Sequence, residues 1–443
     1  MISNKSRKHL HKGYFMFYLG AFTSLSILLV SVKGTAQVAP AHIVIVVLEN
    51  RAYSQLRGNP AAPFINSIIA DAHTATLTQS FGLMHPSQPN YLQLFSGSNQ
   101  GVITNNSPAV FPFTTLNLGA SLIAKKFGFT GYSEDLPSVG YNGDISGAYA
   151  RKHNPWVNWQ DAPVNGIPFS QNRLFADFPT DFSTLPTVSF VVPNQNNDMH
   201  NGSLALTIPQ GDTWLQNNLG NYVEWCKTHN SLFILTFDED DGSHNNQILT
   251  TITGESISGG IYDQPVTHYN ILRTIEELYQ LPPAGSSADS TAVQYIWNAV
   301  AICKGAGSNL QSNLSGTNYQ WQVNSGNGFT NITNNSNYNG VNTRKLQLSN
   351  IPSTWNGYKY RNVVDGVASD PVTIRLFSYW TGAVSTAWEN PLNWSCGSLP
   401  DSNTDVIINT SSTVLLSSTV LIRSFSLSAG AIFQNNGQLT LLH

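Results

Sequence analysis

Two unbroken apolar runs in this chain are each followed directly by acidic or amide residues. The runs are HIVIVVL at residues 42–48 and SLFILTF at residues 231–237. The polar residues that follow them are Glu49, Asn50, Asp238 and Glu239. Runs of Val, Ile, Leu and Phe without polar alternation are typical of parallel strands buried on both faces, and such sheets bind ligands at the carboxyl ends of their strands. If the two strands are neighbours, these polar side chains meet at one edge.

Oxygen-bearing side chains gathered in one place repel one another unless a divalent cation lies between them. The set therefore predicts a site for one divalent metal ion. Carboxylate and amide oxygens accept Ca²⁺, Mg²⁺, Mn²⁺, Fe or Zn²⁺, so the identity of the ion stays open. The alternative is that each group of polar residues only ends its strand with solvated side chains.

A serine lies between two prolines in HPSQPNY at residues 85–91, just before the helix-like run NYLQLFSG. This places Ser87 near the N-terminus of a predicted helix. There, unpaired amides and the helix dipole favour negative charge, which suits both an alkoxide and a phosphoryl group. An ordinary helix cap is the alternative. Together with the two acidic strand ends, the pattern indicates that Ser87 is a nucleophile.

Seven segments then occur in an order that resembles the phosphoesterase family. They are VVLENRAY (46–53), HPSQPNY (85–91), RKHNP (151–155), VVPNQNNDMH (191–200), GDTWL (211–215), LTFDEDDG (235–242) and THYNILRTIEELYQLP (267–282). This family holds bacterial and fungal acid phosphatases and bacterial phosphatidylcholine-type phospholipases C, and it is related to the alkaline phosphatase superfamily. The resemblance covers roughly residues 40–285.

The resemblance implies roles for individual residues. The metal ligands would be Glu49, Asn50, Asp238 and Glu239, with the oxygen of Ser87 completing the shell. A serine hydroxyl beside a divalent cation loses its proton more readily, and its attack on phosphorus would give a phosphoserine intermediate. His153 and His200 match histidines that contact the phosphate and assist the leaving group, a task that imidazole suits because it titrates near neutral pH.

For the histidines and the other candidate residues, a purely structural role is the alternative to a role in the site. His153 follows two basic residues, a pattern more typical of a solvated loop when taken without the family. His85 and Asn90 are candidates for substrate binding, but His85 could equally bond its own turn and Asn90 could cap the helix. His268 begins an amphipathic helix and is expected to be structural. Asp212 is expected to cap a helix.

The N-terminus predicts export. Residues 1–36 begin with basic residues, continue through a long apolar stretch and end in small residues, as a signal peptide does. An uncleaved membrane anchor is the alternative, because the apolar stretch is long. The protein is therefore expected to be secreted or displayed at the cell surface, with the mature chain starting at about residue 37.

Composition excludes some classes of function. Charged residues make up 10% of the 443 residues, and the net charge of -4 gives no reason to expect a nucleic-acid partner. The three cysteines, Cys226, Cys303 and Cys396, are too few for a disulfide framework, and the odd number leaves at least one thiol unpaired. Cys226 is expected to be a small apolar core residue.

The predicted organisation changes after residue 285. Residues 37–285 alternate apolar strands with helical stretches, which predicts a layered α/β catalytic domain with helices on both faces of the sheet. Residues 286–377 contain short alternating runs and resemble an immunoglobulin-like β domain with Trp321 in its core. Asn362 stands where a second cysteine is usual, so Cys303 is expected to lack its usual partner.

Residues 378–443 resemble a further β module. Its tryptophans Trp380, Trp388 and Trp394 could line a platform for glycans or another surface contact, although core positions are more usual.

The sequence thus predicts an exported, metal-dependent acid phosphatase that acts on phosphate monoesters. The closest alternative is a phosphodiesterase of the phospholipase C type acting on phospholipid, and a further alternative is an inactive surface binding protein. A sulfatase is disfavoured, because Tyr91 stands where that class needs arginine.

Overall fold

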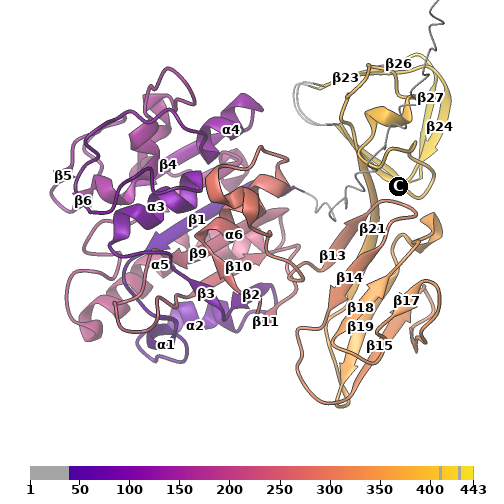
Figure 1. Ribbon diagram of the computed structural model, residues 1–443, viewed down its shortest axis with the longest axis horizontal. Helices are drawn as coiled ribbons and strands as arrows, with labels where there is room; N and C mark the ends of the chain where they lie inside the picture. The colour runs from indigo at the N-terminus through magenta and orange to yellow at the C-terminus, as the bar shows by residue number, and fades with distance from the viewer. Residues whose placement is uncertain (1–38, 409–411, 428–430, 443) are drawn as a thin grey trace, which may run out of the picture. The chain divides into compact units, whose positions relative to one another are not determined.

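The two apolar runs form adjacent parallel strands. The computed structural model describes residues 39–408, 412–427 and 431–442. In it, β1 (His42–Leu48) pairs along its whole length with β9 (Ser231–Phe237), and Leu48 lies opposite Phe237. Both strands are buried, as expected for runs that are apolar on both faces. Their carboxyl ends therefore lie side by side (Figure 1).

These strands lie at the centre of an eight-stranded mixed sheet with the order β11-β2-β10-β9-β1-β8-β4-β7. The other strands are β2 (Thr74–Leu77), β4 (Phe129–Ser133), β7 (Asn172–Leu174), β8 (Val188–Val192), β10 (Thr250–Gly254) and β11 (Gly260–Tyr262). The strands from β9 through β7 run parallel, whereas β10 is antiparallel to both of its neighbours. The parallel half carries the strand ends predicted to bear the site.

Helices cover both faces of this sheet (Figure 1). They are α2 (Pro63–Ile69), α3 (Ser87–Ser96), α4 (Leu118–Ala124), α5 (Leu204–Cys226) and α6 (His268–Leu278). Alternate side chains of β1 point to opposite faces: Ile45 packs in one core with α3, α4 and α6, whereas Val46 packs in the other with α2 and α5. This arrangement confirms the predicted layered α/β fold.

Short elements connect the layers. They are α1 (Tyr53–Leu56), β3 (Ser80–Phe81), β5 (Ile145–Ser146), β6 (Tyr149–Ala150), β12 (Val266–Thr267) and the 3₁₀ turns η1 (Arg151–His153), η2 (Pro155–Trp159), η3 (Phe169–Gln171), η4 (Phe175–Asp177), η5 (Phe182–Thr184) and η6 (Gly285–Asp289). The turn η1 matters most for the site, because it carries His153.

From residue 299 the described chain is built of short strands. They are β13 (Ala299–Ile302), β14 (Ser308–Gln311), β15 (Tyr319–Asn324), β16 (Phe329–Asn331), β17 (Tyr338–Asn339), β18 (Lys345–Leu348), β19 (Lys359–Val364), β20 (Val367–Ala368), β21 (Val372–Tyr379), β22 (Asp405–Ile408), β23 (Thr413–Leu416), β24 (Thr419–Ile422), β25 (Ser424–Leu427), β26 (Ile432–Asn435) and β27 (Gln438–Leu441), with 3₁₀ turns η7 (Ser353–Trp355) and η8 (Pro391–Asn393).

Two apolar cores hold this β-rich region together. Trp321 is buried in the first core. Trp380, Trp388 and Trp394 are buried in the second. Because these three rings are inside the protein, they give no support to a glycan platform on its surface. The immunoglobulin-like assignment and the domain boundaries stay predictions. Strand β21 runs across the predicted boundary at residue 377: its residues 373–376 pair with β13, and its residues 377–379 pair with β22.

Cys303 lacks its usual partner, as expected, but it is not unpaired. It forms a disulfide with Cys396, 93 residues further along the chain. Trp321 lies opposite Asn362 in the pairing of β15 with β19, so the usual cysteine is indeed absent there. The bridge instead joins the start of the β-rich region to the module after β21. Cys226 is a buried free thiol, as expected.

The predicted signal peptide at residues 1–36 lies outside the described residues. Within the part of the chain that the structure describes, no helix is both long and apolar enough to cross a bilayer.

Candidate functional site

The polar residues that follow β1 and β9 are in direct contact. The backbone amide of Asn50 donates to Oδ1 of Asp238 at 3.0 Å, and the side-chain amide of Asn50 donates to Oε1 of Glu239 at 2.9 Å. These contacts follow from the register of the two strands, because the amide of Asp238 donates to the carbonyl of Leu48. The sheet thus brings Glu49 and Asn50 together with Asp238 and Glu239, although the two pairs are nearly two hundred positions apart in the chain.

Ser87 faces this cluster from the first position of α3. Its Oγ donates to Oε2 of Glu49 at 2.9 Å and lies 3.3 Å from Oε1 of Glu239. The side chain is buried, at 1% exposure. The start of a helix leaves its first backbone amides without helical partners, so negative charge that develops on Ser87 is stabilised there.

His153 lies inside the protein rather than on a solvated loop. The hairpin of β5 and β6 leads into η1, which places Nε2 of His153 3.0 Å from Oε1 of Glu49. On the other side of the ring, Nδ1 lies 3.7 Å from Oδ2 of Asp198. The ring also stacks on Tyr91, with centroids 5.2 Å apart. The solvated-loop alternative for RKHNP therefore does not describe this residue.

The other three predicted residues, His200, His85 and Asn90, bond mainly to groups other than Glu49 and Ser87. His200 is exposed, and its ring bonds to the side chain of Asn201 rather than to Glu49 or Ser87. His85 lies at the rim, with Nδ1 2.8 Å from Oε2 of Glu239. Oδ1 of Asn90 accepts from the backbone amides of Leu83 and Met84, so it shapes the loop before the helix.

Several carboxyl groups of the site are buried close together, which opposes their ionisation. Burial raises the pKa of Asp238, and the nearby carboxylates Glu49 and Glu239 raise it further. Burial also opposes ionisation of Glu49, but its interactions with His153, Lys152 and the hydroxyl of Tyr91 outweigh this effect and hold its pKa below the usual value. Burial lowers the pKa of His153 to about 4. The site therefore contains several carboxyl groups and little positive charge to balance them.

Buried atoms without hydrogen-bond partners gather at the same place. Among the described side chains they include Oδ1 of Asn50, Oδ2 of Asp198 and Oδ2 of Asp238. A buried polar atom without a partner is costly, and a cluster of such oxygens is a donor set that suits a divalent cation. The donor set therefore fits a divalent metal ion held by the predicted ligands.

A second acidic group lies next to the site, at Asp240, Asp241 and His244, whose ligand atoms all lie within 4.8 Å of one another. The oxygens of Asp240 accept from the backbone amides of Gly242, His244 and Asn246. Asp240 therefore shapes the turn after β9.

Asp198, Tyr91 and His268 were not among the predicted site residues, yet the structure places them there. Nε2 of His268 lies 2.7 Å from the carbonyl of Asp238, a structural contact as expected for this histidine. Asp198 could have been noticed because it precedes His200 by two residues in the same segment. Tyr91 had no such signal, because a tyrosine inside a helix is usually a core residue. Asp212 caps a helix, as expected, but the helix is α2 rather than its own.

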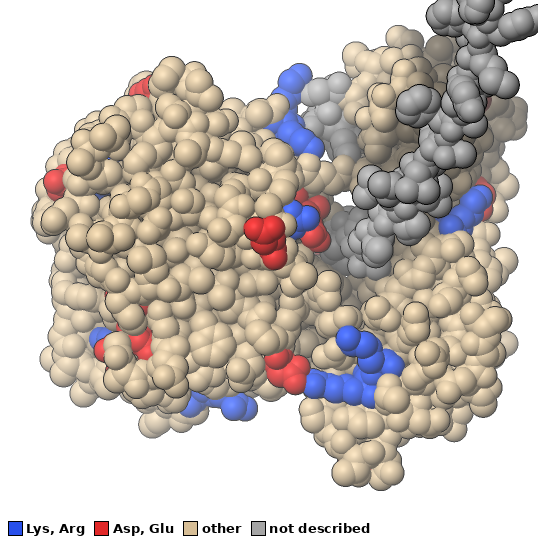
Figure 2. All heavy atoms as spheres, viewed as in Figure 1, with Lys and Arg blue, Asp and Glu red and all other residues tan. Residues whose placement is uncertain are grey.

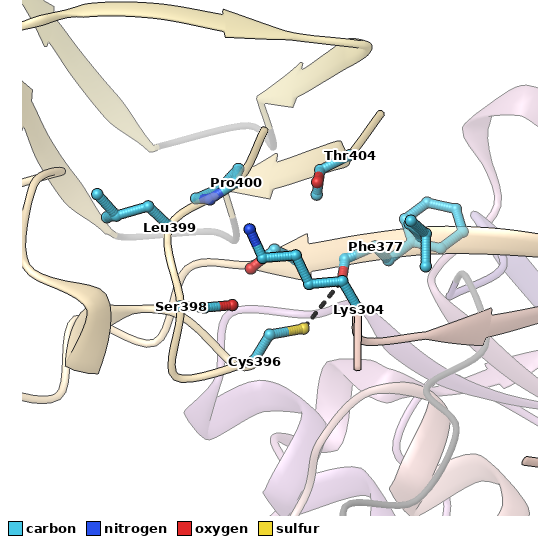
Figure 3. A pocket seen from close by; sticks show the side chains of 9 residues that line it. Lys304, Phe377, Cys396, Ser398, Leu399, Pro400 and Thr404 are labelled. Atoms are coloured by element: carbon cyan, nitrogen blue, oxygen red, sulfur yellow. Dashed lines mark hydrogen bonds between the residues drawn. The ribbon is translucent and has the colours of Figure 1, made fainter. Parts of the chain in front are cut away.

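No large basic patch is visible on the face shown in Figure 2, where charged side chains are scattered. Figure 3 shows a small pocket in the β-rich region, near Lys304, Phe377 and Cys396. Its lining residues all lie beyond the α/β sheet, so this pocket is distinct from the candidate site.

Comparisons with known proteins identify the family of this chain. The Phosphoesterase family matches residues 60–282. A phosphatidylinositol-3-phosphatase of Mycobacterium tuberculosis is 45% identical over 258 residues, which cover 58% of this chain and 83% of that protein. A phosphate-repressible acid phosphatase of Penicillium chrysogenum is 32% identical over 221 residues, covering 47% of this chain and 53% of the fungal protein.

Among solved structures, a protein in the alkaline phosphatase superfamily from Vibrio parahaemolyticus is similar at 12% identity and a TM-score of 0.42, covering 74% of this chain and 81% of that chain. The family match spans half of the chain, and the mycobacterial relative is covered over most of its length. The chain therefore belongs to the phosphoesterase family.

Proposed function

We propose that this protein is a metal-dependent acid phosphatase that hydrolyses phosphate monoesters through Ser87. The observation that carries the proposal is the position of the Ser87 hydroxyl, which is buried at a helix N-terminus and lies between the carboxylates of Glu49 and Glu239. Both curated relatives described above are named as phosphatases, which supports monoester hydrolysis over the phospholipase C alternative.

Five residues would hold the metal ion, namely Glu49, Asn50, Ser87, Asp238 and Glu239. A divalent cation at this place would supply positive charge that favours the ionised serine and the transferring phosphoryl group. Without such charge the carboxyl groups of Glu49 and Asp238 oppose each other's ionisation. The ion is a required cofactor in this proposal, and its identity among the hard and borderline divalent metals is left to experiment.

Chemistry would proceed in two displacements. Oγ of Ser87 forms a bond to phosphorus while the bond from phosphorus to the ester oxygen breaks, which gives phosphoserine and an alcohol. The proton that Ser87 gives up ends on the leaving oxygen, delivered by His153 through its Nε2. Water then attacks phosphoserine: its oxygen bonds to phosphorus while the bond from phosphorus to Oγ breaks, one proton of the water goes to Oγ of Ser87, and phosphate is released. His200 and His85 would contact the phosphate from the rim.

A phosphorylated lipid is a second candidate substrate, since the mycobacterial relative is named a phosphatidylinositol-3-phosphatase. Apolar side chains are exposed on a loop beside Ser87, with Val110 at 78% and Phe111 at 46%. The same loop contacts the nucleophile helix, because Oδ1 of Asn105 accepts from the amide of Gln88. An apolar rim suits a substrate that carries acyl chains.

Export is part of the proposal. The composition of residues 1–36 supports a signal peptide, and the disulfide between Cys303 and Cys396 supports an oxidising compartment.

The decisive experiment is a phosphatase assay and a metal analysis of wild type and Ser87→Ala. We expect wild type to bind a divalent metal and hydrolyse nitrophenyl phosphate, and Ser87→Ala to lose at least about a thousandfold in turnover while keeping bound metal. The control is Ser121→Ala, which removes a buried hydroxyl of α4 away from the site. Turnover retained in Ser87→Ala would show that another residue is the nucleophile.

A substrate comparison separates the alternatives. Preference for bis-nitrophenyl phosphate or phosphatidylcholine would favour the phospholipase C type. Absence of activity across a range of pH values and divalent metals would favour the inactive binding protein.

A further inference from the structure

Arg51 is a buried arginine that directly follows two of the predicted metal ligands, Glu49 and Asn50. The chemistry proposed above assigns no step to it. Burying a cation is costly unless its donors find partners. The place of Arg51 inside the protein therefore needs a reason, and its bonds supply one.

The guanidinium group of Arg51 donates to acceptors in three parts of the fold. Nη1 donates to the carbonyl of Asn50, at the end of β1, at 2.6 Å. Nη2 donates to the carbonyl of Met199 in the loop after β8, and to Oγ1 of Thr207 in the first turn of α5 at 2.7 Å. The planar fork of a guanidinium group bonds several acceptors at once in a fixed geometry. Arg51 thus connects a strand end, a loop and a helix.

Both of these carbonyls belong to residues in the left-handed backbone region. The angle φ is +49° at Asn50 and +79° at Met199. This region is uncommon for residues other than glycine, least favourable for bulky side chains, and persists only where neighbouring contacts hold it. The side chain of Met199 is buried against α5, where a Cβ at Gly211 would lie 2.4 Å from its Cγ. Packing and the bonds from Arg51 together hold the two turns.

The two turns position residues of the proposed site. At the first turn, the backbone amide of Asn50 donates to Oδ1 of Asp238 at 3.0 Å, and its side-chain amide donates to Oε1 of Glu239 at 2.9 Å. At the second turn, the backbone amide of His200 donates to Oδ1 of Asp198 at 2.8 Å. The placement of a predicted metal ligand and of a predicted phosphate contact thus depends on backbone conformations that the arginine holds.

We propose that Arg51 is a positioning residue, which fixes the turns at Asn50 and Met199 and so orients the Asn50 side chain and the loop that carries His200. The inference rests on the function proposed above, in which Asn50 binds the metal ion and His200 contacts the phosphate. Arg51 acts through these residues and touches neither the metal nor the substrate.

Two variants separate the bridging geometry from the charge. Arg51→Lys keeps the positive charge, but an ammonium group lacks the planar fork that spans the two carbonyls. Arg51→Met keeps a long side chain and removes both the charge and the donors. The matched control is Arg423→Met, because Arg423 is a partly buried arginine bonded to Asp405 in the β-rich region.

Hydrogen exchange of the metal-free protein measures the two turns without any ligand. Exchange of a bonded amide reports local opening. In Arg51→Lys and Arg51→Met, we expect the backbone amides of Asn50 and His200 to exchange faster than in wild type by about tenfold or more. In Arg423→Met both should exchange as in wild type.

Exchange of both amides within about twofold of wild type in Arg51→Lys would overturn the proposal. Should Arg51→Met fail to fold, Arg51→Lys alone decides. Failure of both variants to fold would also overturn the proposal, because it would show that Arg51 supports the whole fold rather than two turns.

Metal binding tests the consequence for the site. Mn²⁺, Zn²⁺ and Ca²⁺ are titrated separately into metal-free protein by calorimetry, and the variants are compared with the ion that wild type binds most tightly. We expect Arg51→Lys to bind that ion about tenfold more weakly, because residues that orient a ligand have effects of this size. Its kcat on nitrophenyl phosphate should fall even at saturating metal, since the loop that carries His200 is displaced.

Arg423→Met should match wild type in both measurements. Unchanged metal affinity and kcat in an Arg51→Lys protein of lowered thermal stability would show a merely structural role and overturn the proposal. Failure of the proposed function is distinguishable: a wild-type protein that binds no divalent metal and hydrolyses no phosphate ester would overturn that function, whereas exchange of the Asn50 and His200 amides would still decide whether Arg51 holds the two turns.

Discussion

At the scale of single residues, the site contains carboxyl groups that are buried close together. Both their burial and their mutual repulsion oppose their ionisation. Burial and the repulsion from Glu49 and Glu239 raise the pKa of Asp238. This repulsion destabilises the folded protein, and the divalent cation proposed above would offset it. Metal binding should therefore be visible in the stability of the protein as well as in its activity.

Replacing Asp238 by asparagine should separate these two effects. In the presence of a chelator, Asp238→Asn is expected to be more stable than wild type by about 1 kcal/mol, because burial and the neighbouring carboxylates oppose the charge that the substitution removes. With metal added, wild type should gain more stability than the variant, which has lost a charged ligand. Thermal unfolding with and without metal measures both.

Glu224→Gln is the control for this experiment, because Glu224 is an exposed partner of Lys227 away from the site. Its response to metal should equal that of wild type. An Asp238→Asn protein that is less stable than wild type under chelation would contradict the account of repulsion.

At the scale of elements, the start of α3 and the ends of the parallel strands place the site, and α6 supports them from one face of the sheet. Glu276 of α6 is buried and accepts from the amide of Ala284 and the hydroxyl of Ser287. Its carboxylate thus connects α6 to the segment around η6, which follows the family-matched region.

Burial raises the pKa of Glu276 to about 7, from 4.5 for an ordinary glutamate. Between these two pH values the folded protein keeps a proton that the unfolded chain has released, so its stability should fall as the pH rises from about 4.5 to about 7. Glu276→Gln cannot ionise and should flatten this part of the pH dependence. Thermal unfolding at several pH values measures the difference, and an unchanged profile in the variant would count against the assignment.

At the scale of the whole molecule, the β-rich region is held by two apolar cores and one disulfide. The bridge between Cys303 and Cys396 closes a long loop, and it joins the residue after β13 to a turn that precedes β22, on the two sides of the predicted boundary at residue 377. Cross-links of this kind stabilise a protein mainly by restricting the unfolded chain.

Removal of the bridge should therefore weaken the β-rich region and leave the phosphatase site intact. The double variant Cys303→Ser and Cys396→Ser is expected to lose about 2 to 4 kcal/mol of stability in that region with little change in kcat. Thiol titration of the denatured wild-type protein should find one free thiol, that of Cys226. Three free thiols in protein recovered from its native compartment would show that the bridge does not form there.

Local patterns in the sequence were sufficient to predict the layered α/β fold and the meeting of the polar residues at one edge of the sheet. The reason is physical: an unbroken apolar run must be buried on both faces, and parallel strands so buried end together. The antiparallel strand β10 was not predicted, because pairing direction depends on how the chain returns to the sheet. The roles of the predicted site residues remain proposals.

Contacts between distant segments were decided only by the tertiary structure. The contact between His153 and Glu49 depends on how the hairpin of β5 and β6 brings η1 to the end of β1, and no spacing along the chain encodes that contact. Likewise, the pairing of Cys303 with Cys396 depends on β21, because Cys303 follows a strand that pairs with β21 and Sγ of Cys396 contacts the carbonyl of Phe377 in β21. Sequence periodicity reports which face of an element is buried, whereas the partner across a fold is chosen by packing of the whole chain.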